Sequence, residues 1–155
     1  MKIGLISDTH GLLRPEVFDY FQGVAQVLHA GDVGPYELIV ELESIAPVVA
    51  VFGNTDGFDV RQRLPAVAQL EIDGRRVVVT HGHELGSPTP ARLAAAYPHA
   101  DIVVYGHTHR PLVERAGRTL VVNPGGAGAP RFALPPSIAL LTLGAGIEDV
   151  ELITL

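Results

Sequence analysis

The chain opens on an apolar run, Ile3-Gly4-Leu5-Ile6, that leads directly into the polar residues Ser7-Asp8-Thr9-His10. A short run of this kind, bounded by polar residues, is typical of a strand that is buried on both faces. Two further apolar runs follow at 25–28 and 48–52, and apolar residues with helical spacing lie between the runs at 15–21 and 36–45. The order is strand, helix, strand, helix, strand, which predicts parallel strands joined by right-handed crossovers.

Strand patterns dominate the second half of the chain. The runs 67–72 and 75–80 flank Asp73-Gly74, a pair that supplies the positive φ angles of a tight hairpin turn. A short helix is predicted to begin at Thr89-Pro90. The remaining strand patterns lie at 102–105, 112–116, 119–122, 138–143 and 147–153. We therefore expect a second sheet, or a sheet edge, from about residue 67 onward, with 127–136 as the only loose loop.

The composition is that of a folded domain with an acidic balance. Hydrophobic residues make up 47% of the 155 residues and charged residues 18%, with a mean hydropathy of +0.28. This length predicts a single domain over residues 1–155 with no cap domain. The net charge of −6 argues against a nucleic-acid binder that neutralises phosphates along a basic face.

Cysteine usage and hydropathy bear on the compartment. Cysteine is absent, which excludes disulfides, thiolate metal sites and cysteine nucleophiles and fits the reducing cytoplasm. The longest nearly apolar stretch, 45–52, is far shorter than the ~20 residues that span a bilayer. We therefore expect a cytoplasmic protein without a membrane segment. The high apolar fraction also leaves surplus hydrophobic surface, through which a homodimer could form.

Side chains that bind metals follow almost every predicted strand. They are Asp8, His10, Asp32, Asn54, His81, His83, His107 and His109. Five of the seven histidines therefore fall in these loops. Because sites in open α/β sheets form beyond the carboxyl ends of the strands, we expect these side chains to converge at one edge.

The mixture of ligand types indicates a pair of metal ions. Carboxylate, carboxamide and neutral imidazole groups together suit Mn²⁺, Fe²⁺, Zn²⁺, Co²⁺ or Ni²⁺. More than six ligands exceed a single tetrahedral or octahedral site, whereas two ions that share one carboxylate would use the whole set. Paired ions ~3.5 to 4 Å apart can clamp both oxygens of a phosphoryl displacement. Their four positive charges would outweigh Asp8 and Asp32, which gives a local means of meeting a phosphate.

The ordered motifs resemble those of the calcineurin-like metallophosphoesterase family. They are Asp8-x-His10, Gly31-Asp32, Gly53-Asn54-x-Asp56, His81-Gly82-His83 and Gly106-His107-Thr108-His109. With its short length and Asn123-Pro124-Gly125, the chain is most similar to the small bacterial and archaeal phosphodiesterase branch, from residue 2 to about residue 143. The resemblance implies an α/β fold, a four-layer α-β-β-α sandwich with mixed sheets.

The resemblance also implies a metal-dependent phosphodiesterase that acts on a small phosphoester. Two divalent ions are expected, with Mn²⁺ first and Fe, Zn, Ni or Co as the other choices. The first ion would be held by Asp8, His10, Asp32 and His109. Asp32 would bridge to the second ion, which Asn54, His81 and His107 would complete. A hydroxide between the ions would attack phosphorus, and catalytic roles are expected for Asp32, Asn54 and His83.

One departure from the family pattern concerns proton donation. Many members place a His directly after the Asn of the Gly-Asn motif, where it helps to protonate the leaving group or contacts the phosphate; here that position is Thr55. A hydroxyl is a poor proton donor near pH 7, which favours substrates with good leaving groups. His83 is the nearest alternative donor by sequence, and it could equally be a partner that orients a metal ligand.

Other residues near the motifs have open roles. Asp56 is expected to orient a ligand rather than to catalyse. Arg61, Arg63 and Arg131, in loops that follow the motifs, are either contacts to a substrate phosphate or solvated surface arginines. Gly126 stands where this branch commonly has Ser, so one hydroxyl is absent.

Two alternatives to the phosphodiesterase interpretation stay open. A phosphomonoesterase or pyrophosphatase could use the same metals, although monoesters have poor alkoxide leaving groups and depend more on the missing acid at Thr55. A catalytically weak protein-interaction scaffold could use the same fold. The complete set of metal ligands argues against a pure scaffold.

Overall fold

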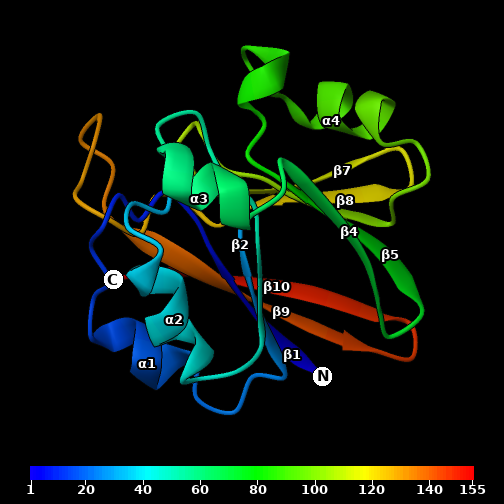
Figure 1. Ribbon diagram of the computed structural model, residues 1–155. Helices are drawn as coiled ribbons and strands as arrows, with labels where there is room; N and C mark the ends of the chain where they lie inside the picture. The colour runs from blue at the N-terminus through cyan, green and yellow to red at the C-terminus, as the bar shows by residue number, and fades with distance from the viewer.

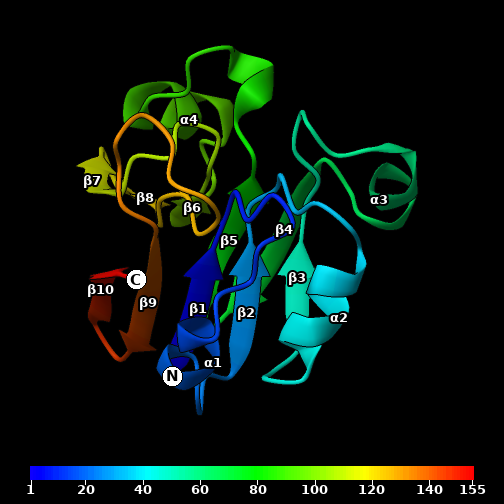
Figure 2. The same ribbon diagram turned by 90° about the vertical axis from the view of Figure 1, so that its left-hand side faces the viewer.

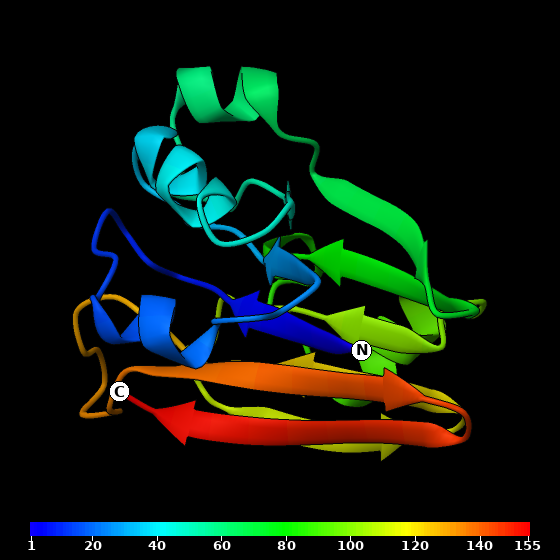
Figure 3. The same ribbon diagram turned by 90° about the horizontal axis from the view of Figure 1, so that it is seen from below.

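The computed structural model describes residues 1–155 and contains two five-stranded sheets. The first sheet has the order β10-β9-β1-β2-β3. Its strands are β1 (Lys2–Ile6), β2 (Gln26–His29), β3 (Val48–Ala50), β9 (Ser137–Gly144) and β10 (Ile147–Thr154). β1, β2 and β3 are parallel, as the sequence predicts, and β9 joins β1 in antiparallel register. β9 and β10 form a long hairpin (Figure 3).

The second sheet has the order β4-β5-β6-β8-β7. Its strands are β4 (Val67–Ile72), β5 (Arg75–Thr80), β6 (Ile102–Val104), β7 (Leu112–Ala116) and β8 (Thr119–Asn123). β5, β6 and β8 are parallel, whereas β4 and β7 are antiparallel edge strands. The predicted hairpin turn at Asp73-Gly74 is confirmed, with φ angles of 50° and 76°.

The helices are short, and two of them were not expected from the sequence. They are α1 (Glu16–Tyr20), α2 (Glu37–Glu43), α3 (Phe58–Arg63), α4 (Pro90–Ala96) and a 3₁₀ turn η1 (His83–Leu85). The expectation that Arg61 and Arg63 lie in a loop is wrong, because both belong to α3. A helix of six residues spans too few turns to show a periodic pattern. No helix has the length and apolarity needed to cross a bilayer.

The two sheets lie between helices (Figure 1). Three clusters of buried apolar side chains fill the spaces between these layers. Alternate residues such as Leu5 and Val79 face each other between the sheets. The other face of the first sheet packs on α1 and α2 through residues such as Phe21 and Leu42. The other face of the second sheet packs on Leu93 of α4. The predicted four-layer α-β-β-α sandwich with mixed sheets is confirmed.

His29 at the end of β2 ties together the two loops that begin the predicted site. Its ring is fully buried, and the Gly31 N–H donates to Nδ1 at 3.1 Å, which leaves the ring proton on Nε2. Nε2 then donates to the Thr9 hydroxyl at 3.0 Å, and that hydroxyl donates to the Val33 carbonyl at 2.8 Å. His29 lies outside the motifs, so the sequence predicts no role for it. In the structure its neutral imidazole connects the segments after β1 and β2.

We predict that His29 makes the stability of the fold depend on pH. Burial lowers the pKa of His29 from 6.5 to about 4. Because the unfolded chain then binds more protons than the folded one, the stabilisation is fully present above pH 6.5 and is lost as pH falls toward about 4. The loss amounts to about 3 kcal/mol. Urea denaturation of chelator-treated protein at a series of pH values measures this. The free energy of unfolding should fall more steeply with decreasing pH in the wild type than in His29→Asn, and equal slopes would contradict the prediction.

A second prediction concerns Gly4, which lies in β1 against the ring of Phe21. A Cβ atom on Gly4 would lie 2.9 Å from Cδ2 of that ring. We expect Gly4→Ala to lower the free energy of unfolding by about 1 to 3 kcal/mol through overpacking. Gly144→Ala is the matched control, because its Cβ would meet Ile147 at an ordinary 3.5 Å. Urea denaturation of both variants tests this, and equal effects would refute it.

Candidate metal centre

The predicted ligands lie in loops beyond the carboxyl ends of the parallel strands, where the arrowheads of β1, β2 and β3 point to one edge (Figure 2). The loops after β1 and β2 continue the sheet: the Asp8 N–H donates to the Gly31 carbonyl at 2.9 Å and the His10 N–H to the Asp32 carbonyl at 3.0 Å. The His107 N–H donates to Asp8 Oδ2 at 3.1 Å, which joins the second sheet to the first. Residues far apart in the sequence therefore meet at this edge.

Asp8 lies at the centre of the cluster and is fully buried. Its Oδ2 accepts hydrogen bonds from the Ser7 hydroxyl at 2.6 Å and from the His107 amide. Its Oδ1 has no hydrogen-bond partner. This oxygen faces three imidazole Nε2 atoms, at 3.4 Å for His109, 3.8 Å for His81 and 3.9 Å for His10.

Asp32 lies between the two groups of histidines. Its Oδ2 is 3.2 Å from His81 Nε2 and 3.7 Å from His10 Nε2, while Oδ1 accepts a hydrogen bond from the Thr55 N–H at 2.9 Å. Gly53 leaves room for this carboxylate, because a Cβ atom there would collide with Asp32 Oδ1. No lysine or arginine forms an ion pair with Asp8 or Asp32, and the basic groups within 4.0 Å of their carboxylate oxygens are all imidazoles.

The carboxylates and His81 set one another's protonation. Burial opposes ionisation of Asp8 and Asp32. The nearby imidazoles of His109 and His81 and the Ser7 hydroxyl nevertheless hold the pKa of Asp8 below its usual value. His81 and the Thr55 N–H do the same for the pKa of Asp32. Burial would lower the pKa of His81, yet the two carboxylates raise it. His81 Nδ1 lies 2.8 Å from the Ala30 carbonyl and donates to it, so Nε2 is the atom directed at the carboxylates. A cation bound at Nε2 would replace its proton.

The backbone at the predicted ligands is strained. Asp8, His10, Asp32, His107 and His109 all have positive φ angles, between 46° and 72°. Such conformations cost about 1–3 kcal/mol each and persist where the surroundings fix them, often at functional sites. Burial lowers the pKa of His10 and His107, which keeps both imidazoles neutral and able to bind a metal at neutral pH.

The donor atoms fit divalent cations. Two triplets, Asp8-His10-His109 and Asp8-Asp32-His81, each have their ligand atoms within 4.8 Å of one another. Oxygen and nitrogen ligands about 2 Å from an ion lie roughly 3 to 4 Å apart. Asp8 Oδ1 lies at such distances from His109, His81 and His10, and Asp32 Oδ2 does so from His81. Asp8 Oδ1 and His10 Nε2 are buried atoms without a partner, and a cation between them would satisfy both.

The remaining predicted ligands border these triplets. Asn54 Oδ1 lies 3.1 Å from His81 Nε2, and the His107 ring centroid is 5.2 Å from that of His81. His83 lies on η1, with its ring centroid 5.3 Å from His81 and 6.4 Å from His107. Its Nδ1 is buried without a hydrogen-bond partner, and Nε2 is 4.0 Å from Glu84. His83 therefore lies beside His81 and His107, with no hydrogen bond to a predicted ligand.

Asp56 and Arg61 hold the loops in place. The Asp56 carboxylate accepts three backbone N–H groups, from Val33, Gly34 and Gly53, at 2.8 to 3.2 Å. It therefore joins the loops after β2 and β3. Arg61 donates to the carbonyls of Asp56 and Asn54 at 2.7 and 3.2 Å.

Three residues support the cluster through contacts that the sequence analysis did not assign to them. Ser7 bonds to Asp8, and Asn123 donates to the Gly106 carbonyl at 3.1 Å. A Cβ atom on Gly126 would lie 2.6 Å from His109 Nδ1. The absence of a side chain at Gly126 therefore makes space for His109. The sequence showed only that a hydroxyl is missing at this position.

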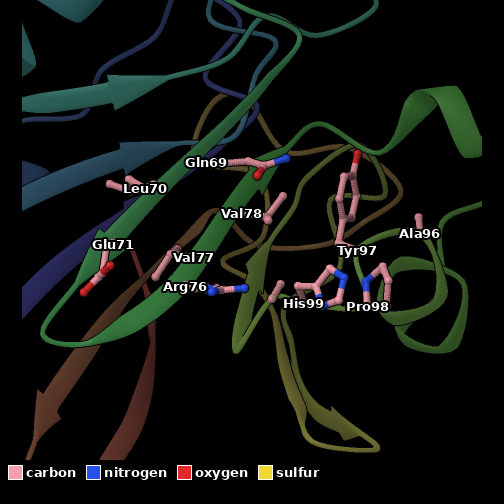
Figure 4. A pocket seen from close by; sticks show the side chains of 11 residues that line it. Gln69, Leu70, Glu71, Arg76, Val77, Val78, Ala96, Tyr97, Pro98 and His99 are labelled. Carbon is pink, nitrogen blue, oxygen red and sulfur yellow. The ribbon is translucent and has the colours of Figure 1, made fainter.

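A cleft of about 450 Å³ opens onto the cluster. Asp32, Asn54, Thr55, His107 and His109 line it, together with rim residues that include Arg110, Arg131 and Phe132. A second hollow of about 490 Å³ lies over β4, β5 and the end of α4, with Tyr97 and His99 on its wall (Figure 4). It contains none of the predicted ligands.

Comparison with known proteins agrees with this geometry. A family model for the calcineurin-like phosphoesterase superfamily domain matches residues 1–146. The chain is 37% identical to a probable metallophosphoesterase of Methanothermobacter thermautotrophicus, over 99% of this chain and 92% of that protein. It is 34% identical to the phosphodiesterase YfcE of Escherichia coli K12, over 91% and 87% of the two chains.

A solved structure of a novel archaeal phosphodiesterase matches 100% of both chains, with a TM-score of 0.81 and 29% identity. The resemblance that the ordered motifs indicate is therefore confirmed. The chain belongs to the calcineurin-like phosphoesterase superfamily.

Proposed function

We propose that this protein is a metal-dependent phosphodiesterase that hydrolyses small phosphodiesters at the edge described above. The observation that carries the proposal is Asp8 Oδ1, a buried carboxylate oxygen that has no hydrogen-bond partner and faces three imidazoles. A buried charge of this kind is retained where a cation binds. Relatives over nearly the whole chain are named phosphodiesterases, which supports the reaction type.

Two divalent ions would be held by the chain's own side chains. Asp8, His10, Asp32 and His109 are proposed for the first, and Asn54, His81 and His107 for the second, with Asp32 shared. Ions bound there would lower the pKa of a shared water so that hydroxide is present at neutral pH. Mn²⁺ is our first choice of metal, and the cysteine-free composition fits work in the cytoplasm.

The chain's residues favour diesters with good leaving groups. Thr55 lies on the cleft wall at the position where a proton donor would serve, and its hydroxyl does not ionise near neutral pH. His83 does not line the cleft, so a donor role would require it to act through another group. Phosphomonoesters, whose alkoxides need a proton, are therefore expected to react more slowly than aryl diesters.

Removal of the shared charge should abolish activity. We expect Asp32→Asn to lower Mn²⁺-dependent hydrolysis of bis(p-nitrophenyl) phosphate by more than about 100-fold, because it removes the carboxylate that both ions would share. The thermal stabilisation of chelator-stripped protein by added Mn²⁺ should be lost as well. His99→Ala is the control, since His99 lies in the hollow away from the cluster. Full activity in Asp32→Asn would overturn the proposed site, and metal binding without hydrolysis by the wild type would favour the scaffold.

Restoring an acid at position 55 should change the dependence on the leaving group. We expect Thr55→His to raise kcat roughly 10- to 100-fold for aryl methyl phosphates with basic leaving phenols, and much less for p-nitrophenyl esters. Thr55→Gln is the matched control, because a carboxamide does not release a proton near neutral pH. A plot of log kcat against leaving-group pKa measures the effect. An unchanged slope in Thr55→His would show that this position does not deliver the proton.

A further inference from the structure

Phe132 is an exposed aromatic residue on the rim of the cleft, and the fold does not explain its position. Its side chain is 77% exposed, so it contributes little to any core. It is nevertheless the one hydrophobic residue among the twelve that line the cleft. Its ring meets His109 edge to face, with centroids 6.4 Å apart and an interplanar angle of 89°. One face of a benzene ring is therefore presented to solvent beside a proposed metal ligand.

The turn that carries Phe132 is fixed. The Leu134 N–H donates to the Arg131 carbonyl at 2.9 Å, and the two residues form an isolated antiparallel bridge. The residues between them, Phe132 and Ala133, both have positive φ angles, 55° and 57°. A bulky side chain is rare in this conformation, and glycine or asparagine is the usual choice. The chain thus holds an aromatic ring at a strained turn tip, where the side chain is largely out of contact with the core.

Two positive charges accompany the ring. Arg110 and Arg131 line the same cleft, and neither guanidinium has a hydrogen-bond or ion-pair partner within the protein. A guanidinium can bind phosphate oxygens through two parallel N–H groups. The rim of the cleft therefore offers two arginines that could bind a phosphate and, beside them, the apolar ring of Phe132, which could contact a planar group.

The ring also lies on the side of the cleft away from Thr55. Thr55, which the proposed function places toward the leaving group, follows β3, whereas Phe132 belongs to the loop 127–136 that precedes β9. Figure 2 shows that loop (orange) and the segment after β3 on opposite sides of the site edge. The part of a diester that stays on phosphorus would therefore lie toward Phe132.

We propose that Phe132 is a stacking platform for a planar aromatic group on the retained side of the substrate, so that the preferred substrates are small nucleoside or aryl phosphodiesters. The inference rests on the proposed function and names its substrate class. A ring and two arginines recognise a base and a phosphate together. A nucleic-acid polymer is disfavoured by the net charge of −6 and by the size of the cleft, about 450 Å³.

The test compares substrates that share one leaving group. p-Nitrophenyl thymidine 5′-phosphate, bis(p-nitrophenyl) phosphate and methyl p-nitrophenyl phosphate all release p-nitrophenolate and differ only in the retained group. We expect Phe132→Ala to reduce the preference for the thymidine and nitrophenyl substrates over the methyl substrate about tenfold, through KM, because stacking on an aromatic side chain contributes this much per base. Phe132→Trp should keep the preference. The two aromatic substrates distinguish a base from a simple aryl group.

Phe58→Ala is the matched control, because Phe58 is also 77% exposed but does not line the cleft. A preference that Phe132→Ala leaves unchanged would overturn the inference. An equal loss on the methyl substrate would also overturn it, since that would indicate damage to the loop or contact with the leaving group.

A binding measurement separates this inference from the proposed function. Calorimetry on Mn²⁺-loaded protein should give a Kd for thymidine 5′-monophosphate that rises about tenfold in Phe132→Ala, while the Kd for methyl phosphate stays the same. If the wild type hydrolysed none of the three esters, the proposed function would fail and these Kd values would still decide the stacking. Equal Kd values in wild type and Phe132→Ala would overturn the inference.

Discussion

The burial of Asp8 without a basic partner is the constraint on which the rest of the site depends. Removing a carboxylate from water is costly unless charge and hydrogen bonds compensate it. Here Ser7 and the His107 amide satisfy one oxygen, while the other faces imidazoles alone. The chain could have placed a lysine or arginine there. Its histidines instead leave the charge to be balanced by a proton or a metal ion, which makes the site dependent on its ligand.

Neighbouring side chains hold the ligands in place, although the two carboxylates repel each other and the backbone at several ligands is strained. His29 connects the loops after β1 and β2, and Asp56 connects the loops after β2 and β3 through three amides. Gly53 leaves space for the Asp32 carboxylate, and a Cβ atom at this position would collide with it. These contacts come from parallel strands and their tight connections. The ligands are therefore positioned by the rigid part of the fold, whereas the rim of the cleft belongs to longer loops.

The sequence predicts the strands and the family more successfully than the residues that hold the loops of the site together. Continuous apolar runs identify β1, β2 and β5 because strands buried on both faces need them. The order of the motifs indicates the family, since each polar group follows a buried strand. The helix at 58–63 is too short for periodicity, and His29 gives no signal because its partner Thr9 lies 20 residues away. Contacts of this kind can be recognised only in the folded structure, where the topology brings distant loops together.

The distribution of strained residues connects the metal centre to the rim. Eight residues other than glycine have positive φ angles: five are proposed metal ligands, and Asp73 is in a hairpin turn that requires the conformation. The two that remain are Phe132 and Ala133, at the tip of the rim turn. Five of these conformations therefore fall on side chains that we propose bind a cation. Phe132 is 77% exposed, so contacts with the core do not account for its conformation. Backbone strain at this edge thus occurs where we propose ligand contacts, with a cation at the five ligands and with a planar group of the substrate at Phe132.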